Sequence, residues 1–231
     1  MTAMPEDIRV QIYTMQSVAE AAAIAALRVD HVGVTPSSVG LPGEIGDDLA
    51  REICREIADS AASVALSVAD DLDAIDRMVR AVRPDILHLC GPPGAVDPGR
   101  VVELRRILPE VAVMQAIAVT GPEAVAEARS FAGVVDFLIL DSLDPDIAGV
   151  GAAGTVHDWE VSAAIVAAVD VPVVLAGGLT PANVSAAISV VGPWGVDSLS
   201  HTNRPSKDGG FRKDRGLVAE FASAARRTGA A

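Results

Sequence analysis

The chain has 231 residues, 50% of them hydrophobic and 3% aromatic, and its 18 basic and 31 acidic residues give a formal charge of −13. This charge argues against nucleic acid or an anionic membrane as a partner, because both bind basic surfaces. Cys54 and Cys90 form no Cys-x-x-Cys motif, no secretory signal is visible, and no apolar run approaches the ~18 residues of a membrane helix. We therefore expect a soluble, cytoplasmic protein.

Short runs rich in Val, Ile and Leu alternate along the chain with Ala-rich stretches of helical period. The runs predict strands over residues 8–13, 30–34, 62–68, 85–89, 111–117, 135–140, 171–176 and 195–199. The stretches between them predict helices over residues 17–27, 47–59, 71–82, 97–107, 121–131, 159–168, 181–191 and 213–227. Several runs are apolar at consecutive positions, which is typical of parallel strands covered on both faces. Eight strand–helix units without a linker predict a single (β/α)₈ barrel domain over residues 1–231, with an open doubly wound sheet as the alternative.

Two of the predicted helices carry capping signals. Ser17 precedes an Ala-rich helix and is followed three positions later by Glu20, which is a capping box. Thr180 and Pro181 predict a cap followed by proline in the first helical turn.

In a barrel of this kind, chemistry takes place in the loops that follow the strands. Gly177 and Gly178 follow the seventh strand, where their backbone N–H groups can approach a phosphate; a plain tight turn is the alternative. The loop after the eighth strand is the most basic part of the chain, which suits an anionic ligand, although a solvated loop would look the same. Its basic residues are Arg204, Lys207, Arg212, Lys213 and Arg215.

Asp141 ends the sixth strand, where a carboxylate can act as general acid or base if burial raises its pKa; a turn residue is the alternative. The long loop that follows, over residues 142–157, is a candidate lid. His88 and Cys90 close the fourth strand on one face, where they can exchange a proton, bind a metal or simply pack. A metal site of His88, Asp141 and His201 is a further alternative.

The sequence also excludes several chemistries. Its two lysines, Lys207 and Lys213, both follow the eighth strand, whereas a Schiff-base aldolase needs a lysine on an inner strand position. There is no Gly-x-Gly-x-x-Gly after the first strand and no P-loop motif. We therefore expect no cofactor.

Several segments together resemble the phosphoribosylanthranilate isomerase family of tryptophan biosynthesis. Residues 85–91 look like the strand-four Gln-Leu-His-Gly segment, 137–142 like the Leu-Leu-Asp strand, and 154–159 like the loop ending in Phe-Asp-Trp. Residues 175–184 match the Gly-Gly-Leu-x-Pro-x-Asn-Val phosphate segment closely. Residues 195–198 and 212–214 resemble the strand-eight Val-Asp segment and the Lys-Asp after it.

The resemblance implies a (β/α)₈ enzyme that performs an Amadori rearrangement of an aminoaldose phosphate. Asp141 would be its general acid, and the substrate phosphate would lie against Gly177, Gly178, Ser200 and His201. In three places the chain departs from the family pattern. The Ser-Gly pair that helps to bind phosphate after strand eight is Ser200-His201 here. Tyr13 stands where the family has its general-base cysteine, and residues 35–46 lack the arginine that holds the anthranilate carboxylate.

These departures predict an altered or absent original activity on the family scaffold. The candidate catalytic residues are Asp141, Tyr13, His88 and Cys90, and we expect a small phosphorylated sugar as substrate and a monomer or homodimer. Two other functions stay open from the sequence: a non-catalytic protein that binds phosphosugars, and a metal-assisted lyase.

Overall fold

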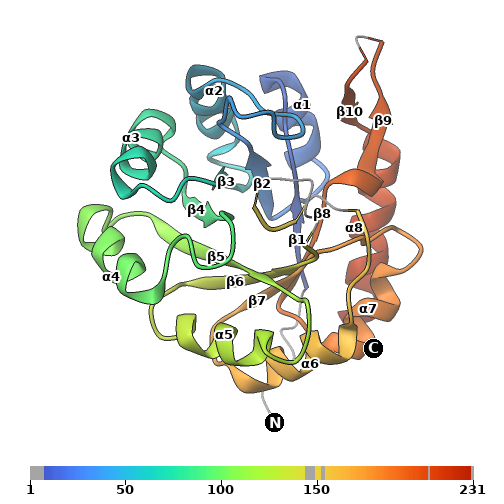
Figure 1. Ribbon diagram of the computed structural model, residues 1–231. Coiled ribbons are helices and arrows are strands. Elements are labelled where there is room, and N and C mark those ends of the chain that lie inside the picture. Colours follow the sequence, from blue (N-terminus) through green and yellow to red (C-terminus); the bar gives the residue numbers. More distant parts are fainter. Residues whose placement is uncertain (1–7, 144–148, 152–153, 208, 230–231) are drawn as a thin grey trace.

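The computed structural model describes residues 8–143, 149–151, 154–207 and 209–229. Its centre is a closed barrel of parallel strands in the order β1 to β8, and Figure 1 shows helices α1 to α8 arranged around it. The strands are β1 Arg9–Ile12, β2 His31–Val34, β3 Ala62–Ser67, β4 Ile86–Leu89, β5 Ala112–Ala118, β6 Phe137–Asp141, β7 Val173–Leu175 and β8 Gly195–Ser198. The helices are α1 Val18–Ala25, α2 Asp47–Ile57, α3 Leu72–Val82, α4 Pro98–Ile107, α5 Ala124–Phe131, α6 Trp159–Ala168, α7 Val184–Val191 and α8 Arg215–Gly229. The (β/α)₈ fold predicted from the sequence is confirmed.

The register that closes the barrel brings the first and last strands together. In the β1–β8 pair, Gln11 lies opposite Asp197 and Ile12 lies opposite Ser198. Apolar residues fill both the layer between barrel and helices and the inside of the barrel. Since all eight strands are parallel, their carboxyl ends and the loops after them meet at one end of the barrel, which we call the mouth.

The caps of α1 and α7 differ in detail from the sequence prediction. Ser17 accepts a hydrogen bond from the Glu20 N–H, as a capping box requires, but the Glu20 carboxylate accepts from the N–H groups of Gln16 and Lys213 instead. Thr180 Oγ1 accepts from the N–H groups of Ala182 and Asn183 in a turn that precedes the helix. This turn occupies residues 180–183, so the helix itself begins at Val184 and not at Pro181 as predicted.

The loop after β8 holds structure that the sequence did not predict. It begins with a short 3₁₀ helix, η1 Ser200–Thr202, and continues as an antiparallel hairpin of β9 Asn203–Pro205 and β10 Phe211–Lys213. Lys213 therefore ends a strand. The prediction that the last helix begins at Lys213 is wrong, since α8 begins at Arg215. The hairpin projects from the barrel rim beside α8 (Figure 1). In the part of the chain that the structure describes, no helix is long and apolar enough to cross a membrane.

Candidate active site

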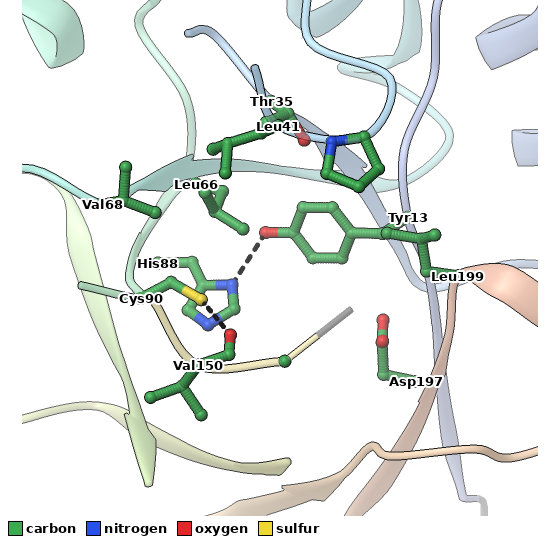
Figure 2. Close-up of a pocket in the computed structure, with 12 residues that line it drawn as sticks. Tyr13, Thr35, Leu41, Leu66, Val68, His88, Cys90, Val150, Asp197 and Leu199 are labelled. Atoms are coloured by element: carbon green, nitrogen blue, oxygen red, sulfur yellow. Dashed lines mark hydrogen bonds between the residues drawn. The ribbon is translucent and has the colours of Figure 1, made fainter. Parts of the chain in front are cut away.

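The barrel mouth contains a small cavity lined by residues from six of the eight strands or the loops that follow them (Figure 2). It encloses about 50 Å³, which is room for a few waters, so a ring-sized group can enter only if part of the lining moves. Most of the wall is apolar. The lining residues are Tyr13, Thr35, Leu41, Pro42, Leu66, Val68, His88, Cys90, Val150, Gly151, Asp197 and Leu199.

Tyr13 and His88 form a buried polar pair across this cavity. Tyr13 Oη and His88 Nδ1 lie 3.1 Å apart, and Figure 2 shows the tyrosine ring extending across the pocket towards the imidazole. Burial raises the pKa of Tyr13 well above its ordinary value and lowers the pKa of His88 to about 3. Both groups are therefore neutral near pH 7, and one hydrogen bond joins the Tyr13 hydroxyl to Nδ1. His88 Nε2 is buried and has no partner among the described residues.

Cys90 ties the loop after β6 to the end of β4. Its thiol donates a hydrogen bond to the Val150 carbonyl at 2.6 Å, while the Val150 N–H donates to the Cys90 carbonyl. Burial and the charge of Asp141 raise the pKa of Cys90 to about 12, so the group stays a thiol near neutral pH. Gly149 belongs to the same contact: a Cβ there would lie 2.0 Å from the Cys90 carbonyl oxygen.

Asp141 ends β6, as predicted, with its carboxyl under the loop that Cys90 holds. The Ser142 N–H donates to Asp141 Oδ1 at 2.7 Å. Gly151, at φ +102°, packs so closely that a Cβ would lie 2.4 Å from Asp141 Oδ2. Burial raises the pKa of Asp141 to about 7, so the carboxyl is poised to give or take a proton near neutral pH.

A second buried carboxyl, which the sequence did not single out as catalytic, stands at the end of β8. Asp197 is 7% exposed, and its Oδ1 has no hydrogen-bond partner among the described residues. Burial, and next the charge of Asp141, raise the pKa of Asp197 to about 8. It projects into the cavity with Tyr13 and also lines a second hollow around Gly177 and Gly178. Asp197 therefore stands between the two compartments.

The second hollow, which we call the cradle, lies between the loops after β6, β7 and β8. Its lining residues are Gly154, Gly177, Gly178, Leu179, Asp197, Ser198, Leu199, Ser200 and His201. Gly177 and Gly178 have φ of +80° and +63°, which only glycine adopts readily. Neither N–H donates to another group among the residues that the structure describes. The amides that the sequence predicted as an anion site thus remain available.

Other side chains hold the walls of the cradle in place. His201 Nε2–H donates to the Gly154 carbonyl at 3.0 Å and so links the loops after β6 and β8. Lys213 is 3% exposed and its ammonium donates to Leu199 O, Thr202 Oγ1 and Asn203 Oδ1, which fixes the turn around η1. The sequence placed Lys213 in a basic cluster, at the start of the last predicted helix and in the Lys-Asp of the family resemblance, because nothing in the pattern showed that its side chain folds inward.

Two other sequence predictions concern the mouth: a metal site and a lid. Among the described residues, no three His, Cys, Asp or Glu side chains converge as a metal site would require. His88 and His201 each hydrogen-bond elsewhere, so the site imagined for them with Asp141 is not formed. Of the predicted lid, residues 144–148 and 152–153 lie outside the described residues.

Comparison with known proteins identifies the family. The model of a family described as N-(5'phosphoribosyl)anthranilate (PRA) isomerase matches residues 10–209. The chain belongs to the phosphoribosylanthranilate isomerase family. A protein of Haloferax volcanii named N-(5'-phosphoribosyl)anthranilate isomerase is 36% identical over 219 residues, 94% of this chain and 93% of its own length. The resemblance stated from the motifs is therefore confirmed, and the chain is an isomerase of this family.

Solved structures of this family share the barrel. Phosphoribosyl anthranilate isomerase from Thermococcus kodakaraensis is 27% identical with a TM-score of 0.75, over 95% of this chain and 99% of its own. Another such isomerase, with a TM-score of 0.73 and 24% identity over 94% of this chain and 98% of its own, was solved with reduced 1-(o-carboxyphenylamino)-1-deoxyribulose 5-phosphate. The second likeness, at this lower identity, shows the fold alone.

Proposed function

We propose that this chain converts a phosphorylated aminoaldose into the matching aminoketose by an Amadori-type rearrangement. The proposal depends on one arrangement above all. Asp141 and the buried Asp197 are two carboxyls of the mouth with raised pKa values, and Asp197 also borders a cradle with free backbone amides. A proton-transfer pair beside an anion cradle is what isomerisation of a sugar phosphate needs.

The cradle anchors the phosphate through backbone rather than side-chain charge. The N–H groups of Gly177 and Gly178 have no partner among the described residues, so a phosphate oxygen can accept from them without breaking existing bonds. Ser200 and His201 complete the hollow on the side of β8. Lys213 lies behind the η1 turn; burial lowers its pKa to about 7, so its charge adds positive potential to the cradle most strongly below that pH.

The carboxyl pair then moves the protons. Asp141, the acid by family resemblance, protonates the ring oxygen as the C1–O bond breaks and a C1=N iminium forms. Asp197, which is ionised in the microstate in which Asp141 holds the proton that the pair shares, removes the proton at C2 to give the enolamine. Protonation at C1 and loss of the C2 hydroxyl proton give the ketone, and no atom is added or lost overall.

The neighbouring groups support this pair without titrating near neutral pH. Tyr13 keeps its proton, and in the tautomer in which the Tyr13 hydroxyl donates a hydrogen bond to His88 Nδ1, the Nε2–H of His88 is free to donate to a substrate oxygen. Cys90, whose thiol is bound to Val150, holds the loop that covers Asp141. The family's base position is thus filled here by a packing tyrosine, and the base role passes to β8.

Site-directed variants test this assignment. An N-substituted phosphoribosylamine, prepared from ribose 5-phosphate and an amine, is the substrate, and the aminoketose is measured by mass spectrometry. We expect Asp141→Asn and Asp197→Asn each to lower kcat/KM by about 10²–10⁴-fold, as loss of an acid or base does. Tyr13→Phe should stay within about tenfold of the wild type, since it removes one hydrogen bond of about 0.5–1.5 kcal/mol.

Binding of ribose 5-phosphate, followed by thermal shift, is the control and should persist in all three variants. Full activity in Asp197→Asn with strong loss in Tyr13→Phe would return the base role to Tyr13. A wild type that binds ribose 5-phosphate but turns over no phosphoribosylamine would contradict the proposal and leave a non-catalytic phosphosugar-binding protein.

A further inference from the structure

The mouth distributes its positive charge very unevenly. None of the loops that follow β1 to β7 contains a lysine or an arginine, whereas the loop after β8 contains Arg204, Lys207, Arg212 and Lys213. The residues outside the described ranges do not alter this, because residues 144–148, 152–153 and 208 include neither residue type. Cationic side chains can thus reach the mouth from its β8 side alone.

Even these cations are directed away from the cavity of Tyr13 and His88. The Lys213 ammonium is bound behind η1, and Arg212 donates to Gln16 Oε1 and to the Phe211 carbonyl. Arg204 and Lys207 are exposed on the projecting hairpin. Arg100, in the first turn of α4, donates to the Ala95 carbonyl. No lysine or arginine lines the cavity among the described residues.

The cavity itself is apolar at one end and acidic at the other. Its apolar wall consists of Leu41, Pro42, Leu66, Val68, Val150 and Leu199. Its titratable wall contains Asp197, and Asp141 lies under Gly151. A carboxylate bound here would lose its hydration without gaining a cation, and it would add negative charge beside a carboxyl pair that already shares a proton.

From these observations we infer that the amine substituent of the substrate, which occupies this cavity, is uncharged and apolar rather than an aromatic acid. The inference rests on the proposed function, since it names the substituent on the sugar phosphate held in the cradle. The carboxyphenylamino group bound by the 24% identical relative is the contrasting case, because it carries the negative charge that nothing in this cavity would neutralise. The chain would then be a phosphosugar isomerase whose specificity has changed from a carboxylated to an apolar amine substituent.

Two stable ligands separate the possibilities. They are 1-deoxy-ribitol 5-phosphates with a phenylamino or a 2-carboxyphenylamino group at C1, which differ only in the carboxylate. We expect titration calorimetry on the full chain to show the phenylamino compound binding at least about tenfold more tightly, with ribose 5-phosphate weaker than both because it lacks the ring. Equal or tighter binding of the carboxylated compound would overturn the inference while leaving the isomerase proposal intact. If none of the three ligands binds, the proposed function itself fails and the inference with it.

A gain of charge tests the same cavity from the other direction. Leu41 lines the wall in the loop after β2 and is 9% exposed, so an arginine there can reach the substituent. We expect Leu41→Arg to shift the ratio of the two affinities at least about tenfold towards the carboxylated compound, and Leu41→Gln, of similar length without charge, to leave it unchanged. An unchanged ratio in a folded Leu41→Arg protein would show that the substituent lies elsewhere. The wild-type comparison stands even if the arginine variant does not fold.

Discussion

The two ends of the barrel mouth present different chemical groups, backbone amides at one end and side chains at the other. The cradle after β7 and β8 is made of backbone, with two glycines of positive φ whose amides face no partner among the described residues. The cavity over β1 to β4 is made of side chains, with apolar walls, a Tyr13–His88 pair and a thiol that ties down a loop. Asp197 touches both.

This contrast explains how family membership and the specificity that we infer can coexist in one chain. Backbone amides bind a phosphate whatever surrounds them, so the cradle keeps its use as long as its glycines remain. Side chains determine what the other end accepts, and here they offer no cation. The sugar phosphate and the amine substituent thus meet different kinds of protein surface. Three measurements test whether the two ends of the mouth act separately.

The largest effect is expected at the residue that joins the two ends. Asp197 has a pKa of about 8 in the folded chain, raised by burial, whereas an unfolded aspartate titrates near ~3.9. The folded chain therefore holds a proton that the unfolded chain has released, and the wild type loses up to about 1.4 kcal/mol of unfolding free energy per pH unit between those values. Asn cannot ionise, so Asp197→Asn should gain on the wild type as pH rises from about 5 to about 8.

Denaturant unfolding of both proteins across this pH range measures the difference. Asp141→Asn should behave in the same direction over a narrower range, since the folded pKa of Asp141 is about 7. Asp59→Asn, a substitution of an exposed carboxylate at the end of α2, is the control. Parallel stability curves for Asp197→Asn and the wild type would mean that Asp197 is solvated and shares no proton with Asp141, and both its proposed role and the division of the mouth would lose their support.

The sequence predicted the fold and the cradle because both depend on local signals. Consecutive apolar runs mark strands buried on both faces, and Gly177-Gly178 between a strand and a helix needs no partner to be recognised. Asp141 was found for a similar reason, since it directly ends an apolar run. Each of these features can be predicted from a few neighbouring residues.

The rest depends on contacts between distant segments. Asp197 is the penultimate residue of β8, and only the closure of the barrel against β1 brings it beside Tyr13. The β9–β10 hairpin has no alternating apolar pattern that would predict it. It is held by hydrogen bonds from outside: Gln16 donates to the Phe211 carbonyl, and Glu20 accepts from the Lys213 N–H. The link between Cys90 and Val150 spans the barrel mouth and leaves no trace in spacing.

A smaller effect is expected from adding one methyl group to the cradle. A Cβ at Gly178 would lie 2.6 Å from the Thr155 carbonyl carbon, and the φ of +63° adds strain of about 1–3 kcal/mol. Gly178→Ala should weaken binding of ribose 5-phosphate by about 10–100-fold and should weaken both phenylamino ligands by the same factor. Gly133→Ala, where a Cβ meets nothing within 4 Å, is the control for both calorimetry and stability. A loss confined to one phenylamino ligand would show that the two ends are not separable.

The smallest effect belongs to Cys90, and it decides whether this thiol is a tether or a base. Cys90→Ala keeps the hydrogen bond from the Val150 N–H to the carbonyl of residue 90 and removes only the one from the thiol, a loss of about 0.5–1.5 kcal/mol. We expect kcat/KM to fall less than about tenfold, and Cys90→Ser to recover most of it because a hydroxyl donates to the same carbonyl. A catalytic thiolate would behave in the opposite way: alanine would cost about 10²–10⁴-fold and serine, which does not ionise at neutral pH, would rescue nothing. A thiol reagent gives an independent measurement, since the pKa values of Cys90 and Cys54, raised by burial to about 12 and about 11, predict that neither reacts in the folded chain near pH 7 and that both react after unfolding.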